Sequence, residues 1–229
     1  MPNPGFRIFT KINRPPAALV DGFKDLPVAN IGDCMNRASM VDARIRKISK
    51  GNLFGPAFTV KSRAGDNLLL HKALDMAEVG DVIVFDAHGD ITNAITGELM
   101  MQTAARKKLG GIIIDGAIRD LATLREMELP IFAAGVTPAG PYKEGPGEIN
   151  VPISLGSVVI MPGDILVGDD DGVVVVRPGD AAGIVEKAKK KQAAEAEKMK
   201  SILAGTIDTS WIDKELAAKG CEIIEDSYH

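Results

Sequence analysis

The sequence has little of several features that mark particular protein classes. Only two of its 229 residues are cysteines, and only 4% are aromatic. Cys34 and Cys221 lie far apart and form no CxxC pair or zinc-binding spacing, so we expect two reduced thiols and no zinc site. The scarcity of aromatic rings argues against a surface on which nucleic-acid bases stack.

The sequence also lacks an excess of basic residues and a long apolar segment. Its formal net charge is −4, whereas a nucleic-acid-binding surface usually carries a basic stripe. No apolar run approaches the roughly eighteen residues of a membrane-spanning helix. The first residues show no basic-then-apolar pattern of a signal peptide. We therefore expect a cytoplasmic protein that binds neither nucleic acid nor a membrane.

Several well-known catalytic motifs are missing. The chain contains no GxSxG, no GxGxxG and no Walker loop, and no Ser-His-Asp or Cys-His order stands out. Its composition is 45% hydrophobic and 25% charged, which is ordinary for a globular chain long enough to bury a sizeable core. Any function must therefore be sought in less familiar patterns.

Apolar strands and helical segments alternate through the first two-thirds of the chain. After a helical lead-in over residues 14–40, the patterns predict strands at 55–62, 82–86, 112–115 and 130–134, and helices at 67–77, 96–109 and 122–127. Further β-structure is expected at 158–160, 165–167 and 173–176, followed by a charged helix over 180–204. This order predicts a mixed α/β domain.

Two loops between these elements are of interest. The segment 135–152 is rich in Gly and Pro, which predicts an ordered surface loop. Its residues 142–144, Tyr-Lys-Glu, could shape a pocket or simply pack. The acidic run 169–171 lacks the ligand spacing of a calcium loop, so we interpret it as a hairpin turn.

Two of the histidines invite a functional interpretation. His71 lies in an apolar helical context and is expected to be structural. Asp86 and His88 follow directly after a predicted strand. They could line a pocket, although a role in the turn is favoured.

The most informative segment is the apolar run 112–114 with the residues that follow it. The run ends in an Asp115-Gly116 turn, and Arg119 and Asp120 come next to each other soon after. Ligand-handling residues gather outside the carboxyl ends of buried strands. One loop would then offer a cation for an anionic substrate and an oxygen ligand for a metal. The same pair could also be two solvated surface charges.

The second candidate is the predicted helix start at Gly97-Glu98-Leu99-Met100. The free backbone N–H groups at a helix start, together with the helix dipole, favour an anion such as a carboxylate. Glu98 could equally be a first-turn carboxylate that complements the dipole.

The two candidates occur in a stretch, GELMMQTAARKKLGGIIIDGAIRD, that resembles the signature of the RraA-like family. The similarity runs from about residue 27 to 205 and includes the segments GPAFTV, GDN and VGDVIVFD. That family contains class II 4-hydroxy-4-methyl-2-oxoglutarate aldolases and regulators of ribonuclease E activity. No glycine-rich nucleotide loop follows the first strand, which argues against a methyltransferase.

The resemblance implies a fold and an assembly. We expect an α/β fold, specifically a compact α/β/β sandwich or half-barrel of the swivelling phosphohistidine-domain type, in a homotrimer or homohexamer. One domain would span residues 1–205, including the helix 180–204, and residues 206–229 would form an extension. The helix would reach a neighbouring subunit, although a solvated helix with i,i+4 ion pairs also fits its sequence.

The resemblance also implies the roles of site residues. The backbone amides of Gly97, Glu98, Leu99 and Met100 would hold a pyruvate carboxylate. Arg119 would contact the pyruvyl group as a catalytic residue, and Asp120 would bind Mg²⁺ or Mn²⁺ directly.

Glu98 would take part in catalysis by ordering water in the metal's shell. A glutamate from a neighbouring subunit's C-terminal helix would do the same, with Glu195 as the first candidate and Glu197 as the second.

These roles imply a lyase that acts on a small 2-oxo acid. It would cleave 4-hydroxy-2-oxo acids such as 4-hydroxy-4-methyl-2-oxoglutarate and decarboxylate oxaloacetate, with the metal as Lewis acid. The alternative is a non-catalytic protein that binds and inhibits a ribonuclease or an RNA helicase. The presence of Glu98, Arg119 and Asp120 favours the enzyme.

Overall fold

The computed structural model describes residues 3–228, and the chain forms two compact units, Met1–Lys189 and Lys190–His229. The first unit contains these elements before its central strands: β1 (Phe6–Ile8), α1 (Ala17–Asp21), α2 (Val28–Cys34) and β2 (Arg46–Lys47). The central elements are β3 (Leu53–Ser62), α3 (Leu68–Met76), β4 (Val82–Asp86), β5 (Ala94–Thr96), α4 (Glu98–Arg106), β6 (Gly111–Ile118), α5 (Leu121–Arg125) and β7 (Ile131–Val136). Five strands follow: β8 (Gly147–Ile149), β9 (Ile153–Leu155), β10 (Val158–Ile160), β11 (Ile165–Asp169) and β12 (Gly172–Val176).

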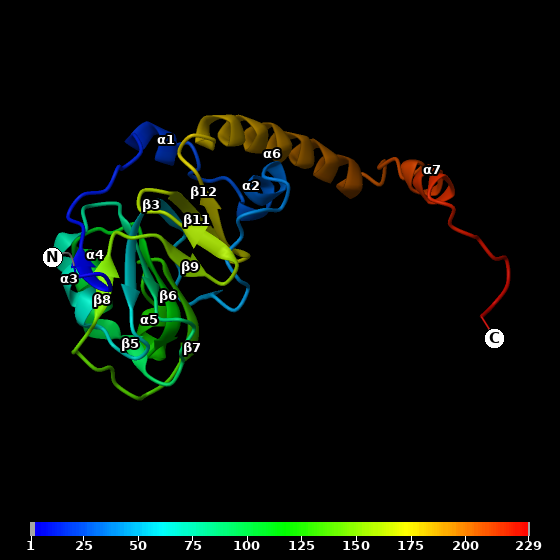
Figure 1. Cartoon of the computed structure of the whole chain (residues 1–229). Helices are drawn as coiled ribbons and strands as arrows, with labels where there is room; N and C mark the ends of the chain where they lie inside the picture. Colours follow the sequence, from blue (N-terminus) through cyan, green and yellow to red (C-terminus); the bar gives the residue numbers. More distant parts are fainter. Residues whose placement is uncertain (1–2, 229) are drawn as a thin grey trace. The chain divides into compact units, whose positions relative to one another are not determined.

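A ten-stranded mixed sheet forms the centre of this unit (Figure 1). Its main path runs β1-β8-β3-β4-β6-β7-β2, and β3, β4, β6 and β7 are parallel neighbours in chain order. The helices α3, α4 and α5 lie in the connections between these strands. Parallel strands need such crossovers, and their carboxyl ends therefore meet at one edge of the sheet.

Both faces of the central strands are buried, which explains their nearly continuous apolar sequences. In β4, Ile83 and Phe85 belong to a core shared with α3 and α4. Their neighbours Val82 and Val84 pack on the opposite face, in a core that includes residues of the β9–β10 and β11–β12 hairpins. The period-2 alternation of the side chains divides one strand between two cores. The layers are thus helix, sheet and hairpins.

The β11–β12 hairpin packs on a third core with α1, α2 and the first turns of α6 (Ala181–Leu203). Phe23 and Ile31 are fully buried there. The hairpin confirms the expected turn at the acidic run 169–171, where the amide of Asp171 donates to Asp169 Oδ1 at 2.9 Å.

Two sequence predictions need correction, and several short strands were not predicted. Residues 14–40 contain two short helices rather than one helical segment. Pro27 stands immediately before the second helix, and residues between and after the two helices adopt positive φ, which a helix does not allow. The segment 135–152 is not all loop, since β8 lies within it and pairs with both β1 and β3. The short strands β1, β2, β5 and β9 were not predicted, because two or three residues carry too little periodicity.

The second unit contains the rest of α6 and the helix α7 (Trp211–Ala218). Ion pairs at i,i+4 spacing join Lys191 to Glu195 and Glu215 to Lys219. None of the helices within residues 3–228 has the length and apolar composition needed to cross a membrane.

Candidate functional site

The two candidate segments meet at the end of β6. Strand β5 pairs with the last residues of β6, and the amide of Arg119 donates to the carbonyl oxygen of Thr96 at 3.0 Å. Gly97 follows Thr96 directly and precedes helix α4. The short strand β5 therefore brings the start of α4 beside the Arg119–Asp120 pair, which lies beyond the last residue of β6.

Asp120 links the two segments by a hydrogen bond. Its backbone adopts a left-handed conformation with φ 61° and ψ 34°, which is uncommon for a residue other than glycine. The amide of Glu98 donates to Asp120 Oδ2 at 2.9 Å, and Arg119 Nε lies 3.9 Å from the same oxygen. Both side chains remain well exposed, at 46% for Arg119 and 42% for Asp120, so their charges are accessible to a ligand.

Position 97 has space only for glycine, because the side chains of Arg119 and Asp120 lie close to its backbone. A Cβ at this position would lie 2.3 Å from Asp120 Oδ2 and 2.9 Å from Arg119 Cγ. Both distances are too short for non-bonded atoms. The glycine predicted to open the anion-binding helix start therefore also leaves space for the carboxylate of Asp120.

We expect Gly97→Ala to impair the site without unfolding the protein. The added methyl group must displace Asp120 or Arg119, so kcat/KM for a substrate of this pocket should fall by about tenfold or more, the usual consequence of misplacing groups by an ångström. Gly183→Ala is the matched control because its Cβ would meet no atom within 4 Å. Equal kcat/KM for Gly97→Ala and the wild type would contradict this role of Gly97.

A pocket of about 270 Å³ opens beside these residues. Its lining combines the site residues with side chains from α3 and from the loop after β7: Asn67, His71, Ile95, Thr96, Gly97, Leu99, Met100, Arg119, Asp120, Pro141 and Lys143. Lys143, for which the sequence left pocket or packing open, thus lines the pocket. With Arg119 it gives the pocket a positive character suited to an anionic ligand.

His71 was misjudged from the sequence. It lies on α3 as expected, but it is exposed and lines the pocket instead of packing in the core. Partial desolvation of the imidazole lowers the pKa of His71, and the charge of Lys143 lowers the pKa further. The position of His71 in the sequence could have indicated that it lines the pocket. Helix α3 starts soon after β3 at the same sheet edge, and His71 follows Asn67 by one helical turn.

Two buried polar atoms beside the pocket have no hydrogen-bond partner among the described residues. They are Asn67 Oδ1 and Thr96 Oγ1. The Asn67 amide is held by its nitrogen, which donates to the carbonyl oxygen of Ile95 at 2.8 Å. Buried groups of this kind are nearly always paired in folded proteins, so their presence next to Arg119 and Asp120 supports a functional pocket.

The wall that carries Lys143 is held by a buried carboxylate. Asp66 Oδ2 accepts hydrogen bonds from the amides of Glu144 at 2.6 Å and Gly145 at 2.9 Å, and Asp66 Oδ1 accepts one from Leu68 at 2.9 Å. Burial alone raises the pKa of Asp66. The backbone hydrogen bonds and Arg63 outweigh it and hold the pKa below its ordinary value.

We expect Asp66→Asn to destabilise the protein by about 2 kcal/mol at neutral pH, since one of the two oxygens that accept from backbone amides becomes an NH₂ group, which cannot accept. The lowered pKa means that the carboxylate stabilises the fold above its unfolded pKa of about 3.9, and that this is lost as the pH falls through the folded pKa. Thermal melts of both proteins from pH 7 to pH 2 should therefore converge at the acid end. A constant difference across this range would contradict the assignment.

The start of α4 retains donors for an anion. The amide of Glu98 is engaged by Asp120, while the first amides of any helix lack intrahelical acceptors. Those of Leu99 and Met100 therefore stand at the positive end of the α4 dipole, beside the pocket.

The carboxylate that lines the pocket is that of Asp120, and Glu98, whose amide donates to it, carries the next carboxylate at the start of α4. Within residues 3–228, no three His, Cys, Asp or Glu side chains are arranged to hold a metal ion. Mg²⁺ is commonly bound through only one or two carboxylates and keeps several waters. The hard-oxygen donor set therefore suits Mg²⁺ or Mn²⁺ better than a soft metal. Glu195 belongs to the second unit and pairs there with Lys191 at 3.1 Å.

Comparison with known proteins identifies the family of this chain. Residues 28–175 match the family described as RraA-like, Aldolase/RraA. A relative from Halalkalibacterium halodurans, described as "Putative 4-hydroxy-4-methyl-2-oxoglutarate aldolase", is 41% identical over 181 residues, which cover 79% of this chain and 86% of the relative.

Two solved structures share the fold. RraAS2 from Streptomyces coelicolor, described as an unusual member of the RNase ES inhibitor RraA protein family, superimposes with a TM-score of 0.72 at 29% identity, covering 82% of this chain and 100% of that chain. The RNA-processing inhibitor RraA from Thermus thermophilis gives a TM-score of 0.62 at 27% identity, covering 66% and 93%.

Proposed function

This chain belongs to the RraA-like family, and on that premise we propose that it is a divalent-metal-dependent pyruvate aldolase. Its reaction would be the retro-aldol cleavage of 4-hydroxy-2-oxo acids such as 4-hydroxy-4-methyl-2-oxoglutarate, with decarboxylation of oxaloacetate as a second activity. The support comes from one observation above all: Arg119 and Asp120 line one pocket with the start of α4, where the amide of Glu98 donates a hydrogen bond to Asp120.

Asp120 would hold the metal, with Glu98 as a further oxygen donor near it. The space that Gly97 leaves for the Asp120 carboxylate and the 42% exposure of that carboxylate support this fit. A bound Mg²⁺ or Mn²⁺ would act as a Lewis acid toward the 2-oxo acid.

The protein's own groups would do the remaining work. The amides of Leu99 and Met100 would bind the substrate carboxylate at the start of α4. When the bond between C3 and C4 breaks, its electron pair moves toward the 2-oxo group, and pyruvate enolate forms. The guanidinium of Arg119 would stabilise the negative charge that develops on the enolate oxygen.

Glu98 is our candidate for the proton transfers. Acting through the water that it would order, it would take up the proton of the 4-hydroxyl group during cleavage and assist protonation of C3 afterwards. In oxaloacetate, CO₂ leaves in place of the second carbonyl product, so only the protonation of C3 remains.

We further propose a homotrimer or homohexamer whose subunits have the swivelling phosphohistidine-domain architecture. In that assembly the helix 180–204 of a neighbouring subunit would bring Glu195, or else Glu197, to the site.

The proposal is tested by measuring pyruvate release with lactate dehydrogenase as the coupling enzyme. Oxaloacetate and 4-hydroxy-4-methyl-2-oxoglutarate serve as substrates, with Mg²⁺, with Mn²⁺ and with EDTA. Because oxaloacetate decarboxylates slowly in metal solutions, the rate without protein is subtracted. We expect activity that needs the metal and disappears with EDTA.

The alternative is an inhibitor of a ribonuclease or an RNA helicase, which the descriptions of the two solved structures bring into consideration. No pyruvate release from either substrate, combined with inhibition of purified ribonuclease E, would favour that alternative over the enzyme.

A further inference from the structure

The C-terminal extension, residues 206–229, carries the whole net charge of the chain. It contains six acidic and two basic side chains, and the resulting charge of −4 equals that of the complete sequence. The rest of the chain is therefore neutral as a set. Three acidic side chains of the extension, Asp213, Glu222 and Glu225, have no cationic partner within ion-pair distance in the part of the chain that the structure describes.

The extension also exposes large apolar side chains. Trp211 is 58% exposed, Ile212 and Leu216 are exposed beside it on α7, and no residue of this helix is buried. Ile223 and Ile224 are more exposed still. An isolated helix of eight residues is only marginally stable in water, and gathered exposed apolar side chains usually mark an interaction surface. The extension thus has the composition of a segment that docking would stabilise.

A groove of about 580 Å³ between α3 and α4 has apolar side chains for such a segment. Leu74 lines it from α3, and Leu99 and Met100 line it from α4. Leu99 is 83% exposed, which is unusual for a leucine side chain in a folded domain. The groove shares His71, Leu99 and Met100 with the pocket of the candidate site, so the two adjoin.

The groove also carries positive charge without an acidic partner. Lys107 Nζ donates to two carbonyl oxygens in the last turn of α3, at 2.6 and 2.8 Å, and no carboxylate of the described residues lies within ion-pair distance of it. The carboxylate in the lining, that of Asp75, is paired with Lys72 at 2.6 Å. Arg106 follows Leu99 by two helical turns and therefore lies on the same face of α4. It likewise has no acidic partner within residues 3–228.

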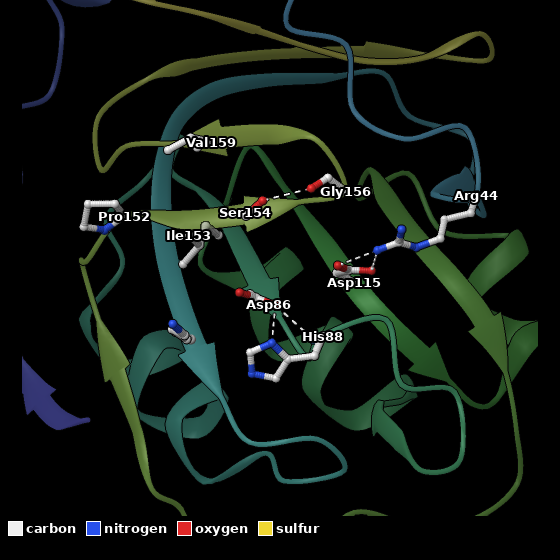
Figure 2. A pocket seen from close by; sticks show the side chains of 10 residues that line it. Arg44, Asp86, His88, Asp115, Pro152, Ile153, Ser154, Gly156 and Val159 are labelled. Atoms are coloured by element: carbon white, nitrogen blue, oxygen red, sulfur yellow. Dashed lines mark hydrogen bonds and ion pairs between the residues drawn. The ribbon is translucent and has the colours of Figure 1, made fainter. Parts of the chain in front are cut away.

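The pocket of about 540 Å³ in Figure 2 suits an acidic segment less well. Arg44 pairs there with Asp115 at 2.6 Å, and Lys61 has Asp86 as its register partner on the next strand. Asp86 is buried, and its Oδ1 accepts a hydrogen bond from the amide of His88 at 2.9 Å. The turn role that the sequence predicts for Asp86 and His88 is thus present, and both residues also line this pocket. Its two carboxylates leave it without an excess of positive charge.

A third pocket, of about 450 Å³, is no better suited to an acidic segment. Arg14 and Lys108 line it, but Asp21 and Glu128 do so as well. Arg14 is already bound to both oxygens of Asp81, at 2.9 and 2.7 Å. The charges therefore favour the groove between α3 and α4.

We propose that the C-terminal extension of a second copy of this chain docks in the groove between α3 and α4. The apolar side chains of α7 would cover Leu99 and Met100, and the acidic side chains of the extension would lie near Arg106 and Lys107. Each copy provides both the groove and the extension, so a closed ring or pair of copies satisfies every contact. The inference rests on the self-association in the proposed function and not on its chemistry. The docked extension would border the candidate site.

Cross-linking of two thiols in differently tagged copies tests the proposal. Cys221 is an exposed thiol within the extension, and Thr103→Cys places a thiol in the groove. Two copies are co-expressed with Cys34→Ser in both. One carries Thr103→Cys and Cys221→Ser, and the other keeps Cys221. A short bismaleimide should join them into a product that carries both tags on a denaturing gel.

Val159→Cys in place of Thr103→Cys is the matched control. Val159 is exposed on β10, whose neighbouring residues pack on the sheet face opposite to α3 and α4. This control should give little of the product. Asp75→Cys provides a second thiol in the groove, so the test remains valid if thermal melting shows that Thr103→Cys does not fold.

Charge reversal tests the electrostatic part of the contact. Arg106→Glu in the copy with the groove thiol should slow formation of the product at least about threefold, because attraction becomes repulsion. Arg125→Glu makes the same change at an exposed position of α5 and should have no effect. Glu222→Lys with Glu225→Lys in the other copy should restore the rate for Arg106→Glu.

Absence of a product with both tags would overturn the proposal, as would an equal yield with Val159→Cys or an unchanged rate with Arg106→Glu. A cross-link within a single copy that contains both Thr103→Cys and Cys221 would overturn it too, because the chain's own extension would then occupy the groove. Cross-linking needs no substrate, so its failure leaves the proposed aldolase reaction untouched. Failure of the pyruvate assay would equally leave the docking untouched.

Discussion

Replacing Arg119 by alanine is expected to lower kcat for pyruvate release by about 10²- to 10³-fold, the usual loss when a group that stabilises developing negative charge is removed. Arg119 is 46% exposed and lines the pocket beside Asp120. Its contact with the fold is chiefly through the backbone, where its amide donates to Thr96. The free energy of unfolding of the variant should therefore lie within about 0.5 kcal/mol of that of the wild type, because most substitutions of exposed side chains change it by no more than this.

Arg119→Lys separates charge from geometry. A lysine keeps the positive charge but lacks the planar fork of the guanidinium, so we expect activity between that of the alanine variant and the wild type. The loss in Arg119→Ala should appear mainly in kcat, because the charge on the enolate oxygen develops only as the bond breaks. A rise in KM with unchanged kcat would mean that Arg119 only binds the substrate.

The second large effect is expected for Asp120→Asn. Asparagine preserves the shape of the side chain and an oxygen that accepts from the Glu98 amide, so the local structure should survive. It removes the negative charge that would hold a divalent cation. We expect pyruvate release to fall by about 10²-fold or more at the Mg²⁺ concentration that saturates the wild type, the order of loss seen when a metal site is disrupted.

Binding of Mn²⁺, measured by electron paramagnetic resonance of the free ion, provides a readout that does not depend on activity. The wild type should deplete free Mn²⁺ and Asp120→Asn should not. Asp171→Asn is the matched control, because it removes an exposed aspartate from the β11–β12 turn. Equal Mn²⁺ binding by Asp120→Asn and the wild type would contradict the role of Asp120.

The parallel core of the fold could be predicted from the sequence because its signals are strong and local. Strand β4 contains the apolar run from Val82 to Phe85 after a Gly80-Asp81 turn, and β6 begins at the second residue of a glycine pair. The strand β8 and the division of the helical lead-in into two short helices could not be predicted. Strand β8 is held by pairing with β1 and β3, which are distant in sequence, and such pairings leave little trace in a three-residue segment.

Some residues of the candidate site could be predicted from local sequence signals, and others could not. Gly97 and the Arg119–Asp120 pair carry local signals, namely a helix start and a strand end. His71 does not, because the helix that carries it is otherwise apolar on its inner face, and only the tertiary structure shows that His71 faces the pocket. The hydrogen bonds from the amides of Glu144 and Gly145 to Asp66 likewise could not be predicted from the sequence, because the partners are separated by 78 and 79 positions.

The most direct test of the proposed enolate chemistry is exchange of the pyruvate methyl protons in D₂O, followed by proton nuclear magnetic resonance. Pyruvate is the fragment common to all the proposed substrates, so the result does not depend on which 2-oxo acid is physiological. With Mg²⁺, the wild type should exchange these protons well above the rate without protein, and Arg119→Ala or added EDTA should abolish the increase. Exchange no faster than in Mg²⁺ alone would contradict the assignment of this pocket as a pyruvate enolate site.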